Sequence, residues 1–465
     1  MTSTYALQRA PDRPVTNDPG GGLTTEPAGE RLASLDAYRG FIMTMLAASG
    51  FGVARFASLP PEAPVWQFRE REFWEHLAFH FEHPDWGSRF GLMGISCWDL
   101  IQPAFMFMVG VAMPFSYASR EAAGQNKGRR IGHALWRAVV LVLLGVFLYS
   151  LGSPRTNWIF PNVLAQIGLG YFFAYLLLGR RHWIQWTALG GILIGYGLFF
   201  RQYSVPPDYD FAAVNASADR GEVYSDRFAP WSKNGNAAHA FDVWFLNLLR
   251  NPSDEDLAAA GATRDAESWA PETLRKWLFE NPEAFSFNGG GYQTLNFVPS
   301  IGTTLLGILC GQLLIKRRKP WRTVGILAAW GAGCMLIGLL AGEFVCPIVK
   351  RIWTPSWVLF SGAYVIWMLA AFYVVFDILP LRKLAFPLAV VGMNSIAIYL
   401  MGELIRGWTS SRVVSIHLTG LLQTIFGEGA MADDMYGRLI MPTATFAVFW
   451  LIAWWMYRRR YFIRI

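Results

Sequence analysis

The sequence has few cysteines, few charged residues and no basic stretch with interleaved aromatic residues. Of its 465 residues only 4 are cysteine; Cys97, Cys310 and Cys334 lie within apolar stretches and Cys346 lies near the edge of one. This placement excludes a disulfide framework and a cysteine metal site. Charged residues make up 16% of the chain and the net charge is +7. Without a basic, aromatic-rich soluble segment, that charge gives no ground for nucleic-acid binding.

The first part of the chain also lacks large apolar side chains. Residues 1–30 are rich in proline, glycine, threonine and aspartate. They are too polar for a signal peptide and too short for a domain. We expect a disordered cytoplasmic tail here, followed by a transmembrane domain over residues 31–465.

Long apolar runs fill most of the remaining chain. One helical crossing of a bilayer needs roughly 20 consecutive apolar residues. The sequence offers these candidates: 35–53, 93–118, 134–151, 160–179, 183–200, 294–315, 322–342, 356–377, 384–405 and 437–457. The pattern predicts an all-α fold, a polytopic membrane bundle of about ten transmembrane helices.

The connecting segments predict the orientation of these helices, because lysine and arginine in short loops stay cytoplasmic. Basic clusters follow every even-numbered stretch, for example Arg129 and Arg130 after the second and Lys316–Lys319 after the sixth. The longest opposite connection, about 201–292, is acidic and is predicted to be an extracytoplasmic insertion with helical spacing at 240–249 and 270–279. Both termini are therefore expected in the cytoplasm. We expect a multi-pass protein of a bacterial cytoplasmic (inner) membrane.

Ionisable side chains within apolar stretches are candidates for function, because burying them in a membrane is costly. Asp36 and Arg39 are three residues apart on one helix face, which fits either an ion pair or a cationic clamp for a phosphate. Asp99 stands near the outer end of the second stretch, with Pro103 one turn deeper. It is predicted to face a polar cavity, the alternative being capping or packing. Glu403 has a similar position in the ninth stretch.

Amide and hydroxyl side chains form a second group of candidates. Asn296 follows Gly290 and Gly291 at the start of the sixth stretch, where glycines allow a backbone to approach a ligand. Asn394 and Ser395 lie in the middle of the ninth stretch, where small polar residues also join helices together. Each set is predicted to bind substrate; the alternative is an ordinary loop for the glycine-rich stretch and helix packing for Asn394 and Ser395.

The connection between the first two stretches is rich in imidazole and indole groups. His76 and His80 have the i, i+4 spacing of a metal pair, but the sequence has no His-Glu-x-x-His motif, and we predict no metal site. His83 and Trp86 stand just before the chain re-enters the membrane. Imidazole titrates near neutrality, so His83 is a candidate general base or nucleophile.

Several of these segments together resemble the opening of the heparan-alpha-glucosaminide N-acetyltransferase family of transmembrane acyltransferases. The resemblance rests on six motifs in order: Arg31–Gly40, His83-Pro84-Asp85-Trp86, Trp98–Pro103, Phe105–Gly110, Pro161–Gly168 (which contains Asn162) and Gly392–Ile396. It runs from about residue 31 to 405. The chain departs from the family at Ala48-Ser49-Gly50, where members can carry an asparagine, and at Gln166, where an arginine is expected.

The resemblance implies transfer of an acetyl group from cytosolic acetyl-coenzyme A, across the membrane, to the amine of a glucosamine unit on the far side. It also implies that His83 is the catalytic group. The donor substrate would be acetyl-coenzyme A, with no metal, and the acceptor would be an amino sugar or glycan. Membrane lipid and a second copy of the chain in a homodimer are further expected partners.

The chemistry also follows from the residues themselves. His83 is predicted to take the ammonium proton, Asp99 to orient the imidazole, and Asn162, Asn296 or Asn394 to hold the developing oxyanion. Trp86 offers an aromatic face for a sugar. Direct transfer and an acetyl-histidine intermediate both remain open. The alternative functions are a secondary transporter of a small solute or sugar, and a membrane scaffold protein.

Overall fold

The computed structural model describes residues 32–83, 86–87, 95–261, 277–316 and 319–463. The tail predicted at 1–30 lies outside these residues. Residues 33–465 form one compact unit, and every regular element in its described part is a helix. Among the described residues, seven helices are long and apolar enough to cross a membrane, and there are up to nine crossings if each of two bent pairs counts as one. The predicted all-α fold, a polytopic helical membrane bundle, is confirmed.

Seven long helices coincide with predicted stretches. They are α4 (Cys97–Ala122), α5 (Lys127–Ser150), α7 (His182–Arg201), α11 (Phe297–Ile315, with η5, Thr294–Asn296, before it), α12 (Pro320–Phe344), α13 (Pro355–Tyr373, continued by η6, Val374–Ile378) and α18 (Gly437–Arg458). The fourth predicted crossing, 160–179, is shorter than expected. Its helix α6 (Val163–Leu177) has 15 residues, about 22 Å of rise, because Asn162 caps it at one end and Leu178 leaves it in extended conformation at the other.

The first predicted crossing is bent by 49°. It begins as α1 (Ala33–Ala47), passes through η1 (Ser49–Gly52) and ends as α2 (Val53–Ala57). All four residues of η1 have positive φ, from 50° to 72°, and a right-handed helix cannot continue through such residues. Gly52 is required for a second reason, since a Cβ atom there would lie 2.0 Å from the carbonyl oxygen of Arg438.

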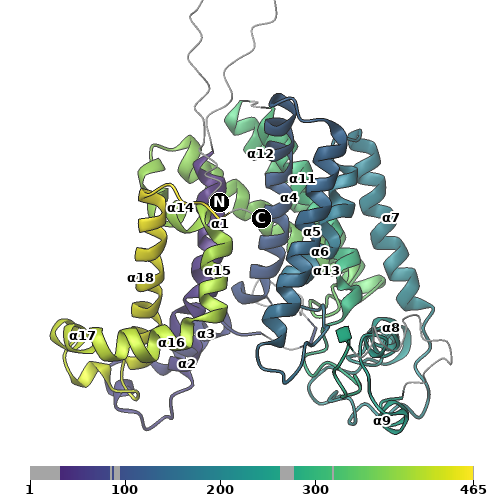
Figure 1. The fold of residues 1–465 in the computed structure, drawn as a ribbon, viewed down its shortest axis with the longest axis horizontal. Coiled ribbons are helices and arrows are strands. Elements are labelled where there is room, and N and C mark those ends of the chain that lie inside the picture. The colour runs from purple at the N-terminus through teal and green to yellow at the C-terminus, as the bar shows by residue number, and fades with distance from the viewer. Residues whose placement is uncertain (1–31, 84–85, 88–94, 262–276, 317–318, 464–465) are drawn as a thin grey trace, which may run out of the picture. The chain divides into compact units, whose positions relative to one another are not determined.

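The ninth predicted crossing is bent by 64°. It consists of η7 (Arg382–Ala385) with α14 (Phe386–Met393), then α15 (Ser395–Leu404), and Asn394 lies at the break. The chain continues through α16 (Arg406–Trp408), η8 (Thr409–Leu418) and α17 (Thr419–Phe426). These last elements lie at the end of the bundle that carries α2 and α3 (Arg71–Phe79) (Figure 1).

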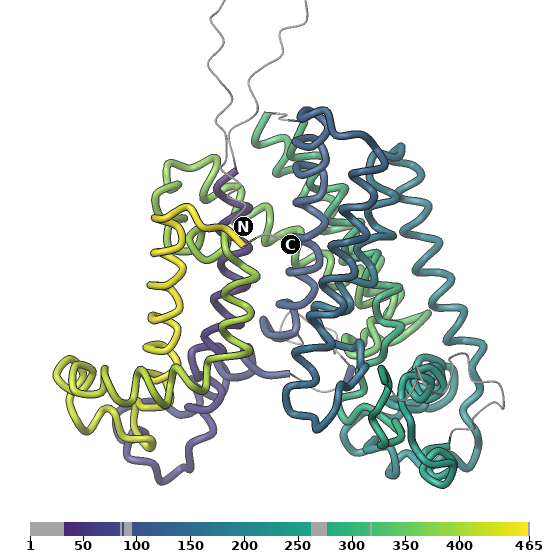
Figure 2. The backbone as a smooth tube through the Cα atoms, viewed as in Figure 1, coloured from purple at the N-terminus to yellow at the C-terminus, as the bar shows by residue number. Residues whose placement is uncertain are grey.

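The helices fall into two packed sets. Helices α1, α14, α15 and α18 pack on one another, and α4 to α7 pack with α11 to α13. Helix α1 also contacts α4 and α13, which joins the sets. The chain passes between the sets twice, after α3 and again after α13 (Figure 2).

Glycines allow the closest helix contacts. A Cβ atom at Gly40 of α1 would lie 1.8 Å from the Leu388 carbonyl oxygen of α14. Between α4 and α11, Cβ atoms at Gly110 and Gly307 would lie 2.1 Å from the carbonyl oxygens of Thr304 and Phe107. Small residues at such crossings let backbones approach, which is how helices associate in lipid.

The insertion predicted at 201–292 is folded where the structure describes it. It contains η4 (Asp226–Trp231), α8 (Ala237–Asn247) and α9 (Asp254–Ala259). Helix α8 confirms the helical spacing seen at 240–249, whereas most of 270–279 lies outside the described residues. Its Trp231 is 1% exposed and stacks on Phe200 of α7, with ring centroids 4.6 Å apart.

The α4–α11 contact yields a stability prediction. Gly307→Ala places a methyl group against the Phe107 carbonyl, so we expect a destabilisation of about 1–3 kcal/mol, the usual cost of overpacking. Gly333→Ala in α12 is the matched control, because a Cβ atom there meets nothing within 4 Å. Thermal unfolding of both purified variants in the same detergent checks this. Equal melting temperatures for Gly307→Ala and the unaltered protein would contradict it.

Candidate active site

The first turn of α4 holds a buried carboxylate. Ser96 is the N-cap of α4, and its hydroxyl oxygen accepts a hydrogen bond from the Asp99 N–H at 3.1 Å. Pro103 lies inside the helix and has no N–H to bond to the Asp99 carbonyl four residues earlier. Asp99 is only 4% exposed. A buried carboxylate needs charged or hydrogen-bonding partners within the protein.

His83 supplies the first partner, as predicted from the sequence. Its Nδ1 lies 2.7 Å from Asp99 Oδ1, a hydrogen-bond distance. An ionised carboxylate only accepts hydrogen bonds, so Nδ1 carries the proton and donates it. Nε2 therefore keeps its lone pair. The His83 side chain is 42% exposed, so the ring is open to a molecule outside the protein.

Lys350 supplies the second partner. It lies in the connection between α12 and α13, 251 residues after Asp99, and its Nζ donates to the same Oδ1 atom at 2.8 Å. Lys350 is 5% exposed. The buried pair is therefore close to neutral overall. We call these three residues the His83–Asp99–Lys350 cluster.

The charges of this cluster act on His83 in opposite directions. Partial burial of the ring lowers the pKa of His83 most, while the hydrogen bond to Asp99 raises it. The Lys350 ammonium, 3.3 Å from Nδ1, lowers it again, and so does Arg351. The net result is a pKa below the ordinary value of 6.5. At neutral pH the imidazole is thus uncharged, with a free Nε2 that can accept a proton.

The sequence interpretation missed Lys350 and Arg351. A signal for them exists: two adjacent cations stand in the connection between the seventh and eighth stretches, which the charge pattern assigns to the outer face. Lysine and arginine are disfavoured in such loops by the positive-inside rule. Lys350 and Arg351 are exceptions to that rule next to an apolar stretch, and such an exception indicates a cation that is paired with an acidic or hydrogen-bonding group of the protein.

One aromatic cluster holds both sides of the site in place. Trp86, three residues after His83, is 2% exposed, and its Nε1 donates to the Trp231 carbonyl at 3.2 Å. Val349 and Ile352, which flank Lys350, are buried in the same cluster. Trp86 was predicted to present its face to a sugar. The structure packs this ring among side chains of α7, the insertion and the Lys350 segment, and its role toward a sugar stays a prediction.

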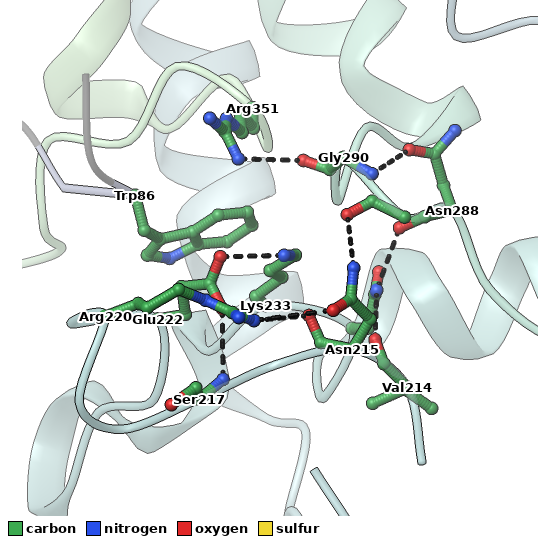
Figure 3. A network of polar contacts seen from close by, with 12 residues as sticks. Trp86, Val214, Asn215, Ser217, Arg220, Glu222, Lys233, Asn288, Gly290 and Arg351 are labelled. Carbon is green, nitrogen blue, oxygen red and sulfur yellow. Dashed lines mark hydrogen bonds and ion pairs between the residues drawn. The ribbon is translucent and has the colours of Figure 1, made fainter. Parts of the chain in front are cut away.

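The glycine-rich end of the insertion approaches Trp86. A Cβ atom at Gly291 would lie 2.4 Å from Trp86 Cζ3 and 3.0 Å from Lys233 Cγ. Lys233, only 3% exposed, pairs with Glu222 at 2.7 Å next to the indole (Figure 3). Arg351 Nη1 donates to the Gly290 carbonyl at 3.4 Å (Figure 3). Here the glycines allow close approach to a tryptophan of this chain.

A row of buried amides connects α4 with the insertion. Gln102 Nε2 donates to Gln166 Oε1, and Gln166 Nε2 donates to the Gln293 carbonyl, both at 3.2 Å. Gln293 Nε2 donates to Asn234 Oδ1 at 3.1 Å. These contacts start one turn below Asp99. They attach the insertion, through Asn234 and Gln293, to α6 and α4.

The predicted oxyanion donors all have backbone partners. Asn162 caps α6 and accepts from the Ala165 N–H. Asn296 Nδ2 donates to the Arg351 carbonyl at 2.7 Å, which secures the segment that carries Lys350. Asn394 Nδ2 donates to the Tyr461 carbonyl at 3.1 Å and its Oδ1 accepts from the Ile463 N–H. Asn162 Nδ2 donates to the Ile159 carbonyl at 3.4 Å, so each of the three amide nitrogens has a backbone acceptor.

The other predicted residues lie away from the His83–Asp99–Lys350 cluster. Asp36 and Arg39 approach each other to 3.9 Å on α1, so the ion pair is present. Ser395 opens α15, and Glu403 is exposed at its far end. Their roles in substrate binding stay predictions.

The two remaining loop histidines have local partners. His76 Nδ1 lies 2.8 Å from the Glu72 carbonyl oxygen. His80 Nδ1 lies 3.8 Å from Cys97 Sγ. Within the part of the chain that the structure describes, no group of three or more His, Cys, Asp or Glu side chains has an arrangement that could hold a metal ion.

Comparison with known proteins finds two distant relatives. The chain is 22% identical to heparan-alpha-glucosaminide N-acetyltransferase of Mus musculus over 485 aligned residues, covering 95% of this chain and 62% of that protein. It is 22% identical to the protein of the same name from Homo sapiens over 419 residues, covering 81% and 53% respectively. The chain thus spans less than two thirds of the length of these relatives. No protein-family model matches it.

The geometry predicts how Lys350 controls His83. Lys350→Gln removes a cation that lowers the pKa of His83 and leaves Asp99 free to stabilise the imidazolium, so the pKa of His83 should rise. Histidine-labelled protein gives this value by NMR titration, with the His83 signal assigned from His83→Ala. Lys383→Gln, which alters an exposed lysine between α13 and α14, is the control. A His83 pKa that stays the same or falls in Lys350→Gln would contradict the arrangement.

Proposed function

We propose that this chain is a transmembrane acetyltransferase. It would move an acetyl group from cytosolic acetyl-coenzyme A to an acceptor on the opposite face, the amine of a glucosamine-containing glycan. The observation that carries the proposal is the His83–Asp99–Lys350 cluster, which presents a neutral imidazole with a free Nε2 atom. The names of the two relatives support the reaction class, and the membrane-spanning helices support a donor and an acceptor on different sides.

The transfer needs one base. The acceptor amine attacks the thioester carbonyl carbon, a C–N bond forms, and the C–S bond to coenzyme A breaks. His83 Nε2 takes the proton that the attacking nitrogen loses, and the leaving thiolate takes up one proton to become a thiol. If an acetyl-histidine intermediate forms first, the same Nε2 attacks the thioester and then passes the acetyl group to the amine. Nε2 is the reacting atom in both routes.

Asp99 and Lys350 both lie beside Nδ1, so they influence the imidazole at the nitrogen that does not react. When Nε2 gains a proton, the hydrogen bond from Nδ1 to Asp99 stabilises the positive ring and keeps it in one orientation. Lys350 keeps Asp99 ionised and opposes a second positive charge beside it. The imidazole therefore returns its proton readily. This balance suits a group that must act as a base near neutral pH.

Other proposed roles rest on the sequence and its resemblance. Asp36 and Arg39 on α1 would lie near the cytoplasmic mouth for the donor, together with the basic loops that the charge pattern assigns to that side. Asn162, Asn296 or Asn394 would have to exchange a backbone partner in order to hold an oxyanion. Ser395 and Glu403 remain proposed acceptor contacts, as does Trp86 after a movement of its ring. A homodimer and bound membrane lipid also stay proposals.

A reconstituted system tests the function directly. The purified chain is placed in liposomes, acetyl-coenzyme A is supplied on one side only, and glucosamine is supplied on the other. We expect release of coenzyme A and formation of N-acetylglucosamine across the membrane. Acceptor movement without acetylation would instead favour a transporter. If neither acetylation nor acceptor movement is observed, the proposal has no support.

His83→Ala should lower acetyl transfer by roughly 10²–10⁴-fold, the usual loss when a general base is removed. His76→Ala is the matched control, because His76 lies in the same connection and its Nδ1 contacts the Glu72 backbone. Turnover per folded molecule is measured for both variants. More than about a tenth of the unaltered activity in His83→Ala would exclude the imidazole as the base.

Asp99→Asn should lower turnover by a similar factor of roughly 10²–10⁴, because an amide can donate to Nδ1 and favour the wrong tautomer. The variant also loses both influences of Asp99 that raise the pKa of His83. Activity is lost as pH falls through this pKa, so the acidic limb of the rate profile should move to lower pH. An activity near normal with reduced thermal stability would mean that Asp99 only packs α4.

A further inference from the structure

A pocket with several charged side chains in its lining lies beside the bend of the first crossing. It has a volume of about 370 Å³ and is lined by the end of α1, by α16 and η8, and by the start of α18. Three arginines line it, Arg55, Arg406 and Arg438, against one carboxylate, Asp433. None of these residues belongs to the His83–Asp99–Lys350 cluster.

Two of the arginines are partly occupied by this chain. Arg438 pairs with Asp433 at 3.1 Å and donates to the Arg55 carbonyl at 2.9 Å. Asp433 itself is 81% exposed, so water weakens this pair. Arg406 donates through Nη2 to the Leu46 carbonyl at 3.2 Å. The Arg406 Nε atom is buried and has no hydrogen-bond partner.

Arg55 also lines the pocket. It is exposed, and its guanidinium makes no hydrogen bond or ion pair within the part of the chain that the structure describes. Burial lowers the pKa of Arg406 most, the nearby Glu403 raises it, and the charge of Arg55 lowers it. Arg55 and Arg406 are thus close enough to repel each other. An anion between them would relieve this repulsion and give the buried Nε–H an acceptor.

The lining of the pocket is adjacent in the chain to a residue that packs against the segments of the candidate active site. Ala48 and Ser49 line it, and the next residue, Gly50, touches the segments that carry the site. A Cβ atom at Gly50 would lie 2.7 Å from Phe81 Cδ1 and 3.4 Å from Trp98 Cζ3. Phe81 stands two residues before His83, and Trp98 directly precedes Asp99. The residues that line the pocket are therefore directly followed in the chain by a residue that packs close to both segments.

We propose that this pocket binds a tetrahedral oxyanion, a phosphate or sulfate group, through Arg55, Arg406 and Arg438. Guanidinium groups match such oxygens with paired N–H donors, and several of them around one cavity are typical of phosphate recognition. The group is carried either by the acceptor, as an anionic substituent next to the reacting amine, or by a lipid headgroup at the membrane surface. Binding itself requires no acetyl transfer, so the proposal stands or falls separately from the enzymatic function.

Binding of inorganic phosphate and sulfate to protein in dodecyl maltoside, at constant ionic strength, tests this by thermal shift and calorimetry. The unaltered protein should bind both anions. Arg55→Gln should weaken binding roughly tenfold or more, as expected for losing one charge-assisted hydrogen bond. Arg55 is the residue of choice because its exposed side chain contributes little to folding. Arg412→Gln, an exposed arginine of η8 that does not line the pocket, should bind like the unaltered protein.

Asp433→Asn gives a test in the opposite direction. The change releases Arg438 from its ion pair and removes the one carboxylate of the lining, so it should tighten phosphate binding. A purely structural role of the arginines predicts no such gain. Absent binding, or equal binding in the unaltered protein, Arg55→Gln and Asp433→Asn, would overturn the proposal.

Two further arms identify the source of the anion. If the acceptor carries it, glucosamine 6-phosphate should bind more tightly than glucosamine, and Arg55→Gln should remove the difference. If a lipid carries it, nanodiscs containing phosphatidylglycerol should abolish the binding of inorganic phosphate that is seen in detergent. Either result supports an oxyanion site and assigns its ligand.

Discussion

One carboxylate oxygen organises the candidate site. Asp99 Oδ1 accepts hydrogen bonds from His83, 16 residues earlier in the chain, and from Lys350, 251 residues later. Because Asp99 and Lys350 are both almost fully buried, loss of Lys350 would leave the Asp99 carboxylate as a charge that water hardly reaches. The helices around α4 therefore have to place the α12–α13 connection within hydrogen-bond distance of its first turn. The close glycine contact between α4 and α11, and the aromatic cluster around Trp86, both serve this placement.

The two bent crossings give the bundle a second organising constraint. At the first bend, four residues of positive φ stop the helix, and a Cβ atom at Gly50 would lie 2.7 Å from Phe81 and 3.4 Å from Trp98. At the second bend, Asn394 binds the segment near Tyr461. Irregular backbone is tolerated at such depth only where protein or water satisfies its polar groups. The bends are thus points where the bundle can carry polar groups, and the arginine pocket lies at one of them.

Much of the fold could be predicted from the sequence, because apolar length and loop charge report directly on the membrane. Every predicted crossing coincides with a helix or a bent pair, although α6 is shorter than expected. The contact of His83 with Asp99 was also predicted. Lys350 was missed, because hydrogen bonds between residues 251 positions apart leave no periodic pattern. Trp86 and the asparagines were chosen for chemistry that they can perform, and the structure shows them in packing, capping and joining segments. Their roles toward a substrate stay predictions. A side chain's type restricts its possible roles, and only its neighbours select one.

The distance along the chain between Asp99 and Lys350 has a consequence for biogenesis. A membrane protein is inserted from its N-terminus as it is synthesised, so α4 enters the bilayer long before α12 and α13 exist. During that interval the Asp99 carboxylate has His83 as its one partner in the cluster. Asp99 raises the pKa of His83 and Lys350 is not yet there to lower it, so the ring is more readily protonated. The cluster gains its cation only when the connection after α12 is delivered to the same face. Insertion of α12 and α13 in the correct orientation therefore completes the site electrostatically, and a chain that ends before them would retain the histidine and the aspartate in a different charge state.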